Sequence, residues 1–161
     1  IIETLCGGKV SGLQSVWYYG APGTPGFNKH QDSAFVEPDP DTFVSAWSAM
    51  QDVTSEMGGI VGYPGTHGLG RLPVVKIDRD GSPSQDPNAT LEESVVPDGY
   101  KGIDLFVPKG AVLLMHQDFV HSSNGNATDK HRKSLLLTYI KKGSHFRPGN
   151  TAKRAEVEVY V

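Results

Sequence analysis

Short apolar segments, separated by glycine and proline, run along almost the whole chain. The sequence holds 19 Gly and 11 Pro, which leaves little room for long helices. Residues 42–53 show the clearest strand pattern, because Phe43 and Trp47 fall on one face of an extended chain and Val44 and Ala46 on the other. Both faces are apolar, so we expect this strand to be buried on both sides. Strands are predicted at residues 16–19, 42–53, 60–63, 72–77, 111–115, 119–122, 134–140 and 156–161.

Many short strands joined by Gly/Pro turns are typical of an all-β sandwich or barrel, and about eight strands in two sheets is the strand count of a jelly roll. We therefore expect a mainly β protein with short helical or loop insertions. Residues 78–102 interrupt the pattern, because they are rich in Asp, Ser, Pro and Asn. A loop of this length in a compact domain is usually functional or disordered, so we expect either a lid or a disordered insertion.

Composition and charge narrow the class of protein. A chain of 161 residues fits one domain, residues 1–161, and a hydrophobic share of 37% excludes disorder as its main state. The net charge of −3 argues against nucleic acid or an anionic membrane surface as the main partner. The longest apolar run, residues 111–115, is too short for a membrane span. The single cysteine, Cys6, suits a reducing compartment, so we expect a soluble, cytoplasmic protein.

Histidines are concentrated in two His-Gln-Asp segments, His30-Gln31-Asp32 and His116-Gln117-Asp118, and His121 follows the second. In an extended strand, residues i and i+2 point to the same face, so His30 and Asp32 can bind one metal ion together. With a second imidazole from elsewhere, they would form the facial triad of non-haem Fe(II) oxygenases, which leaves coordination positions open. The alternative is an ordinary hydrogen-bonded histidine near a turn, because a His-x-Asp tripeptide often arises by chance.

The pattern of the segment from Lys109 onward predicts part of a pocket. It contains a turn, an apolar strand, a polar Asn/Gly connection and a returning strand that opens with Arg132. This hairpin-like arrangement can place His121 and Arg132 around one pocket. His116 and Asp118 are a competing metal pair, but if they supplied the ligands, the residues around His30 would have no explanation. We therefore expect a supporting or structural role for His116.

Several pieces of the chain between residues 30 and 139 share one pattern: His30-Gln31-Asp32-Ser33, Trp47, Pro64-Gly65-Thr66-His67, His121-Ser122-Ser123 and Arg132. This pattern resembles the phytanoyl-CoA dioxygenase family of Fe(II)/2-oxoglutarate oxygenases. The resemblance implies a double-stranded β-helix. By position, it also implies that His30, Asp32 and His121 are the catalytic iron ligands and that Arg132 pairs with the far carboxylate of 2-oxoglutarate.

The implied chemistry accounts for the residue types. 2-Oxoglutarate would take two of the open positions on iron, and O₂ the third. The planar guanidinium of Arg132 can donate two parallel hydrogen bonds to the C5 carboxylate, which a lysine cannot copy. Ser134, two residues along the same strand, is either a second donor or an ordinary strand serine. The family pattern places Trp47 beside the cosubstrate, and the alternative is a core residue.

The resemblance therefore implies an enzyme, a 2-oxoglutarate-dependent dioxygenase that uses O₂ to hydroxylate a small organic molecule, with succinate and CO₂ as coproducts. The carboxylate of Asp32 favours hydroxylation, because related halogenases have a small residue at that position. Residues 20–28 and 78–102 are the loops expected to set specificity. The Pro-Gly-Thr-His turn with His67 is expected to shape the pocket wall, and His131 and His145 to be solvated or structural.

Two other functions are compatible with the sequence. A cupin-like metal enzyme that does not use 2-oxoglutarate fits two histidines and an aspartate but leaves Arg132 unexplained. A jelly-roll binding domain without turnover would need none of these residues for chemistry. Only 29 residues precede His30, whereas family members usually carry helical material there, so the chain is either a minimal version or a fragment that lacks an N-terminal segment.

Overall fold

The structure, a computed structural model, describes residues 1–77, 91–149 and 153–160. The helices in this part are short: α1 Ile2–Leu5, α2 Ser33–Val36 and the 3₁₀ helix η1 Thr66–Leu69. None of them has the length and apolar character needed to cross a membrane. The strands are β1 Val10–Gly20, β2 Phe43–Ala49, β3 Ile60–Gly62, β4 Val74–Lys76, β5 Glu92–Ser94, β6 Ile103–Asp104, β7 Val112–His116, β8 His121–Ser123, β9 Arg132–Lys141 and β10 Val157–Glu158.

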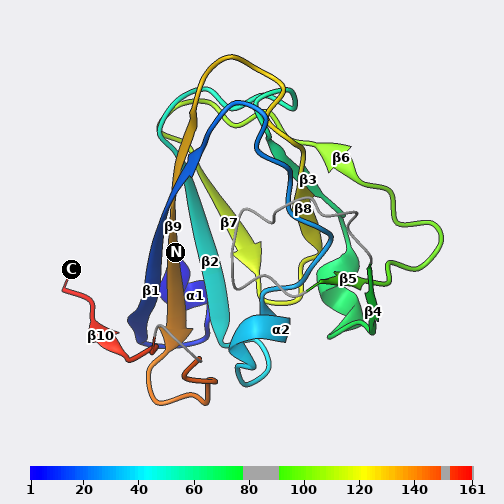
Figure 1. The fold of residues 1–161 in the computed structure, drawn as a ribbon. Coiled ribbons are helices and arrows are strands. Elements are labelled where there is room, and N and C mark those ends of the chain that lie inside the picture. Colours follow the sequence, from blue (N-terminus) through cyan, green and yellow to red (C-terminus); the bar gives the residue numbers. More distant parts are fainter. Residues whose placement is uncertain (78–90, 150–152, 161) are drawn as a thin grey trace.

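Two antiparallel sheets carry the fold (Figure 1). The larger sheet has five strands in the order β10-β1-β9-β2-β7, and the smaller has three in the order β6-β3-β8. Strand β9 pairs with β1 along its whole length and with β2 on its other side. Strands β4 and β5 pair as a separate two-stranded antiparallel sheet. This arrangement confirms the predicted all-β, jelly-roll class.

A hydrophobic cluster lies between the two sheets. Trp47 and Ala49 of β2 and Met115 of β7 pack with Ile60 of β3, and Val53 and Val107 complete the cluster. A second cluster joins Val36 of α2 to Phe43 of β2 and Ile140 of β9, together with Leu13 of β1. Since α2 is fastened to the large sheet in this way, the residue at its N-terminus is held in a defined place.

Each predicted strand overlaps an observed one, but several bounds differ. Strand β2 is buried on both faces as predicted. It ends at Ala49 rather than at residue 53, and Val53 forms only an isolated bridge with Val107. Strand β1 begins at Val10, well before the predicted start, and a register shift between Gly12 and Gln14 interrupts its pairing with β9. Strands β5 and β6 were not predicted. Strand β5 falls within the predicted 78–102 insertion, of which residues 78–90 lie outside the described part of the chain.

Candidate functional site

His30 and His121 face each other across a single antiparallel backbone bridge at the edge of the small sheet. The His30 N–H donates to the His121 carbonyl oxygen at 2.9 Å, and the His121 N–H donates to the His30 carbonyl oxygen at 3.0 Å. Residues directly opposite each other in an antiparallel pair have side chains on the same face. The two rings accordingly lie 4.2 Å apart between centroids, although they are far apart in the sequence.

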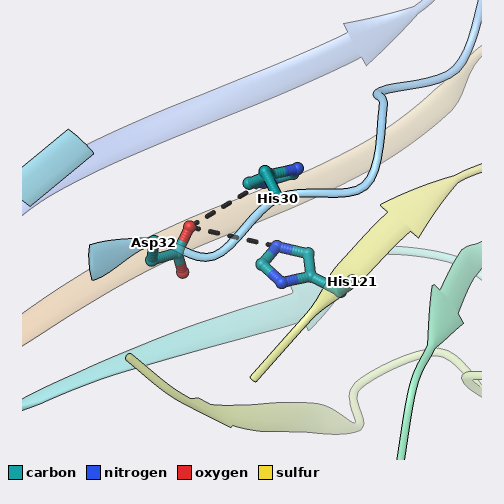
Figure 2. Close-up of side chains that lie close together, drawn as sticks. All are labelled: His30, Asp32 and His121. Carbon is teal, nitrogen blue, oxygen red and sulfur yellow. Dashed lines mark ion pairs between the residues drawn. The ribbon is translucent and has the colours of Figure 1, made fainter. Parts of the chain in front are cut away.

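Asp32 completes the cluster through a different local structure from the predicted one. The argument that His30 and Asp32 share a metal ion assumed an extended backbone, whereas Asp32 has helical dihedral angles (φ −63°, ψ −29°) and is the N-cap residue of α2. The turn into α2 nevertheless brings its carboxylate to the histidines. Asp32 Oδ1 lies 3.9 Å from Nε2 of His30 and 3.9 Å from Nε2 of His121 (Figure 2).

This cluster is suited to a metal ion. One possible ligand atom from each of His30, Asp32 and His121 lies within 4.8 Å of the others, and no other such group of His, Cys, Asp or Glu occurs among the described residues. Two imidazoles and one carboxylate are the donor set of a facial triad, which suits non-haem Fe(II).

Hydrogen bonds to backbone carbonyl oxygens determine which ring nitrogen each histidine can offer to a metal ion. Nδ1 of His30 lies 2.7 Å from the carbonyl oxygen of Asn28, and Nδ1 of His121 lies 3.1 Å from that of Phe119. A carbonyl can only accept, so we infer that Nδ1 carries the proton and that the Nε2 lone pair faces Asp32. Burial, together with the nearby His121, lowers the pKa of His30 to about 4, against the opposing effects of Asp32 and the Asn28 carbonyl. The ring is therefore neutral at neutral pH, as a metal ligand must be.

A cavity opens beside the three side chains. Trp47 and Arg132, both predicted beside the cosubstrate, are among its lining residues and are buried. Much of the remaining wall is apolar. The full lining consists of Tyr18, Phe27, His30, Asp32, Trp47, Ile60, Met115, His121, Ser122, Ser123, Arg132 and Leu136.

Arg132 brings a buried cation to this cavity. It is the first residue of β9, and its Nη1 donates to the carbonyl oxygen of Gly58. Burial lowers the pKa of its guanidinium, and an electrostatic interaction with Tyr18 opposes that shift. Ser134 is not among the lining residues, but it lies on the same buried face of β9, with the exposed Lys133 between them. Its fully buried Oγ has no hydrogen-bond partner in the described part of the chain.

The Pro-Gly-Thr-His turn contacts the backbone next to His121. Its residues are absent from the described cavity lining, where we had expected the turn to form a wall. Thr66 Oγ1 instead accepts from the Val120 N–H at 2.9 Å and donates to the Tyr63 carbonyl oxygen at 2.7 Å. Gly65 adopts φ +85°, a conformation that favours glycine, and so permits the turn. The turn thus holds the residue that precedes His121.

The competing segment with His116 and Asp118 lies outside the cluster. His116 Nε2 is 3.0 Å from Asp41 Oδ1, and its Nδ1 accepts from the Asp118 N–H at 3.1 Å. Both ring nitrogens therefore have protein partners, which fits a structural role. The ring of His67 lies 5.8 Å from that of His116 between centroids.

Sequence reasoning missed several residues of the cavity. Tyr18 and Met115 lie on strands that were predicted, but strand alternation does not show which end of a strand faces a cavity. Phe27 comes from the loop at residues 20–28 and reaches the wall because that loop passes directly against β8. A Cβ on Gly26 would lie 1.9 Å from the Ser123 carbonyl oxygen, so the close approach requires glycine.

Comparisons with known proteins agree with this geometry. A family model described as phytanoyl-CoA dioxygenase (PhyH) matches residues 4–134. The chain is 25% identical over 147 residues to a phytanoyl-CoA dioxygenase of Arabidopsis thaliana, covering 90% of this chain and 50% of the relative. In general, the chain spans about half the length of the relatives it matches.

Solved structures share the fold at lower identity. A non-heme monooxygenase, ThoJ in its apo form, has a TM-score of 0.75 at 20% identity and covers 99% of this chain and 57% of its own. The epimerase SnoN, in complex with Fe³⁺, alpha ketoglutarate and nogalamycin RO, has a TM-score of 0.67 at 20% identity and covers 99% of this chain and 66% of its own. These likenesses extend the jelly-roll assignment over nearly the whole chain.

Proposed function

This chain belongs to the phytanoyl-CoA dioxygenase family, and on that premise we propose that it forms the site of an Fe(II)- and 2-oxoglutarate-dependent oxygenase. The reaction is the hydroxylation of a small organic molecule by O₂. One observation carries the proposal: a cluster of two histidines and an aspartate opens onto the same cavity as the buried Arg132. A metal site alone would not need a buried guanidinium beside it.

His30, Asp32 and His121 would hold the iron. Their donor types match a facial triad, and the hydrogen bonds from Nδ1 to backbone carbonyl oxygens orient both rings with Nε2 toward the shared space. When bound, iron would supply the activation of O₂, coupled to the oxidative decarboxylation of 2-oxoglutarate to succinate and CO₂. When iron is bound, the carboxylate of Asp32 would take the ligand position that a halide would need, which favours hydroxylation.

Arg132 and Ser134 would bind the C5 carboxylate of 2-oxoglutarate. A guanidinium forms paired, charge-assisted hydrogen bonds with a carboxylate, and such bonds are strongest where water is excluded. Arg132 is buried, and the unsatisfied Oγ of Ser134 on the same face supports a second donor. Trp47, on the cavity wall, would pack against the cosubstrate.

The apolar part of the wall would exclude water from the reacting groups. Phe27, Ile60, Met115 and Leu136 contribute to it. Phe27 belongs to the loop at residues 20–28, which supports a role for that loop in substrate contact. The segment at residues 78–102 remains a second candidate for such contact.

An anaerobic titration with Fe(II) and then 2-oxoglutarate tests the proposal. We expect a visible charge-transfer band, which arises when a keto acid chelates iron. Arg132→Ala should bind iron normally but require about 30-fold or more 2-oxoglutarate for the same band, because truncation of one partner of a buried charged pair costs about 2 kcal/mol or more.

Lys133→Ala provides the matched control. It removes the neighbouring cation on the same strand, but Lys133 is on the exposed face and lies over the ring of Tyr19. This variant should titrate like the unaltered protein. Iron binding without any band would contradict the use of 2-oxoglutarate and favour a metal enzyme of the cupin type. Absence of iron binding would favour a domain without turnover.

A further inference from the structure

The side chain of Ser45 lies behind the metal-binding cluster and touches one of its members. Ser45 is on β2, with no solvent exposure, and pairs in register with Met115 of β7 and Thr138 of β9. Its hydroxyl donates to Asp32 Oδ2 at 2.5 Å.

The two oxygens of Asp32 therefore have different surroundings. Oδ2 accepts from Ser45, whereas Oδ1 lies 3.9 Å from Nε2 of each histidine. An aspartate at a helix N-cap usually accepts from a backbone N–H of the first turn, but Asp32 makes no such side-chain cap. The carboxylate is instead turned toward Ser45 on one side and the histidines on the other.

A rigid strand holds the donor of this hydrogen bond. Strand β2 is paired on both sides, by β7 and by β9, so Ser45 cannot shift without disturbing three strands. Asp32 precedes a helix of four residues, which packs on the same sheet through Val36 and Phe43. The hydrogen bond from Ser45 thus adds a second tie between Asp32 and β2.

We propose that Ser45 is a positioning residue that occupies Asp32 Oδ2 and so presents Oδ1 alone to the metal ion. This inference rests on the proposed function, because it assigns a role to Ser45 only if His30, Asp32 and His121 bind a metal. A ligand held through one oxygen leaves more coordination positions open for the cosubstrate and O₂. A residue that orients a ligating carboxylate typically changes metal affinity by about 10- to 100-fold.

Binding of Co(II), followed by its visible d–d absorption, tests this role. We expect Ser45→Ala to weaken Co(II) binding by about 10- to 100-fold. Its d–d spectrum should also change, because the released Oδ2 becomes free to coordinate. The titration is made where circular dichroism shows each variant to be fully folded, so that a change in stability alone does not enter the dissociation constant.

Two further variants separate positioning from general effects. Ser45→Thr retains the hydroxyl and should restore the affinity and the spectrum of the unaltered protein. Ser48→Ala makes the same replacement on the same strand, but Ser48 falls on the opposite face of β2, and Co(II) binding should not change.

The outcomes distinguish this inference from the proposed function. If the unaltered protein binds Co(II) no better than His121→Ala does, the metal site itself is wrong and both proposals fall. If the unaltered protein binds Co(II), and Ser45→Ala binds it with the same affinity and spectrum, only the role of Ser45 is overturned. A loss that Ser48→Ala reproduces would also overturn it.

Discussion

His30 is kept neutral by its surroundings, and this has a consequence for the stability of the metal-free protein. A histidine in an unfolded chain has a pKa near 6.5, whereas burial and the neighbouring His121 lower that of folded His30 to about 4, with Asp32 opposing them. Between these two values the unfolded chain binds a proton that the folded chain does not. The free energy of unfolding therefore falls as the pH is lowered from 6.5 toward about 4.

Urea unfolding in the presence of a chelator measures this effect. We expect His30 to contribute about 2 kcal/mol of lost stability between pH 7 and pH 5. His30→Gln cannot titrate and should lose correspondingly less over this interval. His131→Gln, which removes an exposed histidine, should behave like the unaltered protein. An equal pH dependence in His30→Gln would show that burial of His30 is not the cause.

At the residue scale, the sequence predicted the candidate ligands of the site but not the contacts that support them. The side-chain types of His30, Asp32, His121 and Arg132 predict a metal ion and a carboxylate as their partners. Ser45 has no such signal, because serine occurs in strands for many reasons. Only the packing of β2 against α2 shows that its hydroxyl meets Asp32.

At the scale of elements, one side chain fastens the segment that carries His30 and Asp32 to its neighbours. Gln31 follows His30 and precedes Asp32. It is buried, and its Nε2 donates to the carbonyl oxygens of Gly70 at 2.8 Å and Asp118 at 2.7 Å. Its Oε1 accepts from the Leu72 N–H at 2.7 Å. The amide thus joins this segment to the chain before β4 and to the loop before β8.

Gln31→Leu should lower the free energy of unfolding by about 2–4 kcal/mol, because it leaves backbone groups without these partners. Denaturant unfolding of the metal-free protein is the measurement. Gln14→Leu is the control, since Gln14 is exposed and its side chain accepts from Arg154, and it should cost about 1 kcal/mol or less. If the two variants lost equal stability, the bonds of Gln31 would not join the segments as we describe.

The sequence predicted which strands exist more readily than it predicted where each strand begins and ends. Strand β2 could be predicted because apolar residues lie on both of its faces. In β1, a bulge near Gly12 changes the side chains that face inward, so the period of two breaks and the first half of the strand was missed. Strands β5 and β6 are only three and two residues long, too short to show any period.

The whole molecule brings together residues that no local rule connects. His30 and Asp32 come from a loop and a helix start, His121 from the small sheet and Arg132 from the large sheet. Their convergence was expected only because the pattern resembles a known family. Physical reasoning from the sequence alone reached the jelly-roll class and the His-x-Asp pair, and the backbone bridge between His30 and His121 supplies the missing connection.

The central claim is that one cavity holds both iron and 2-oxoglutarate, and crystals grown without oxygen in the presence of both test it most directly. Anomalous scattering measured at the iron absorption edge locates the metal. Our account predicts one iron peak among His30, Asp32 and His121, with the C5 carboxylate of 2-oxoglutarate at Arg132. An iron peak beside His116 and Asp118, or 2-oxoglutarate bound outside the cavity, would contradict it.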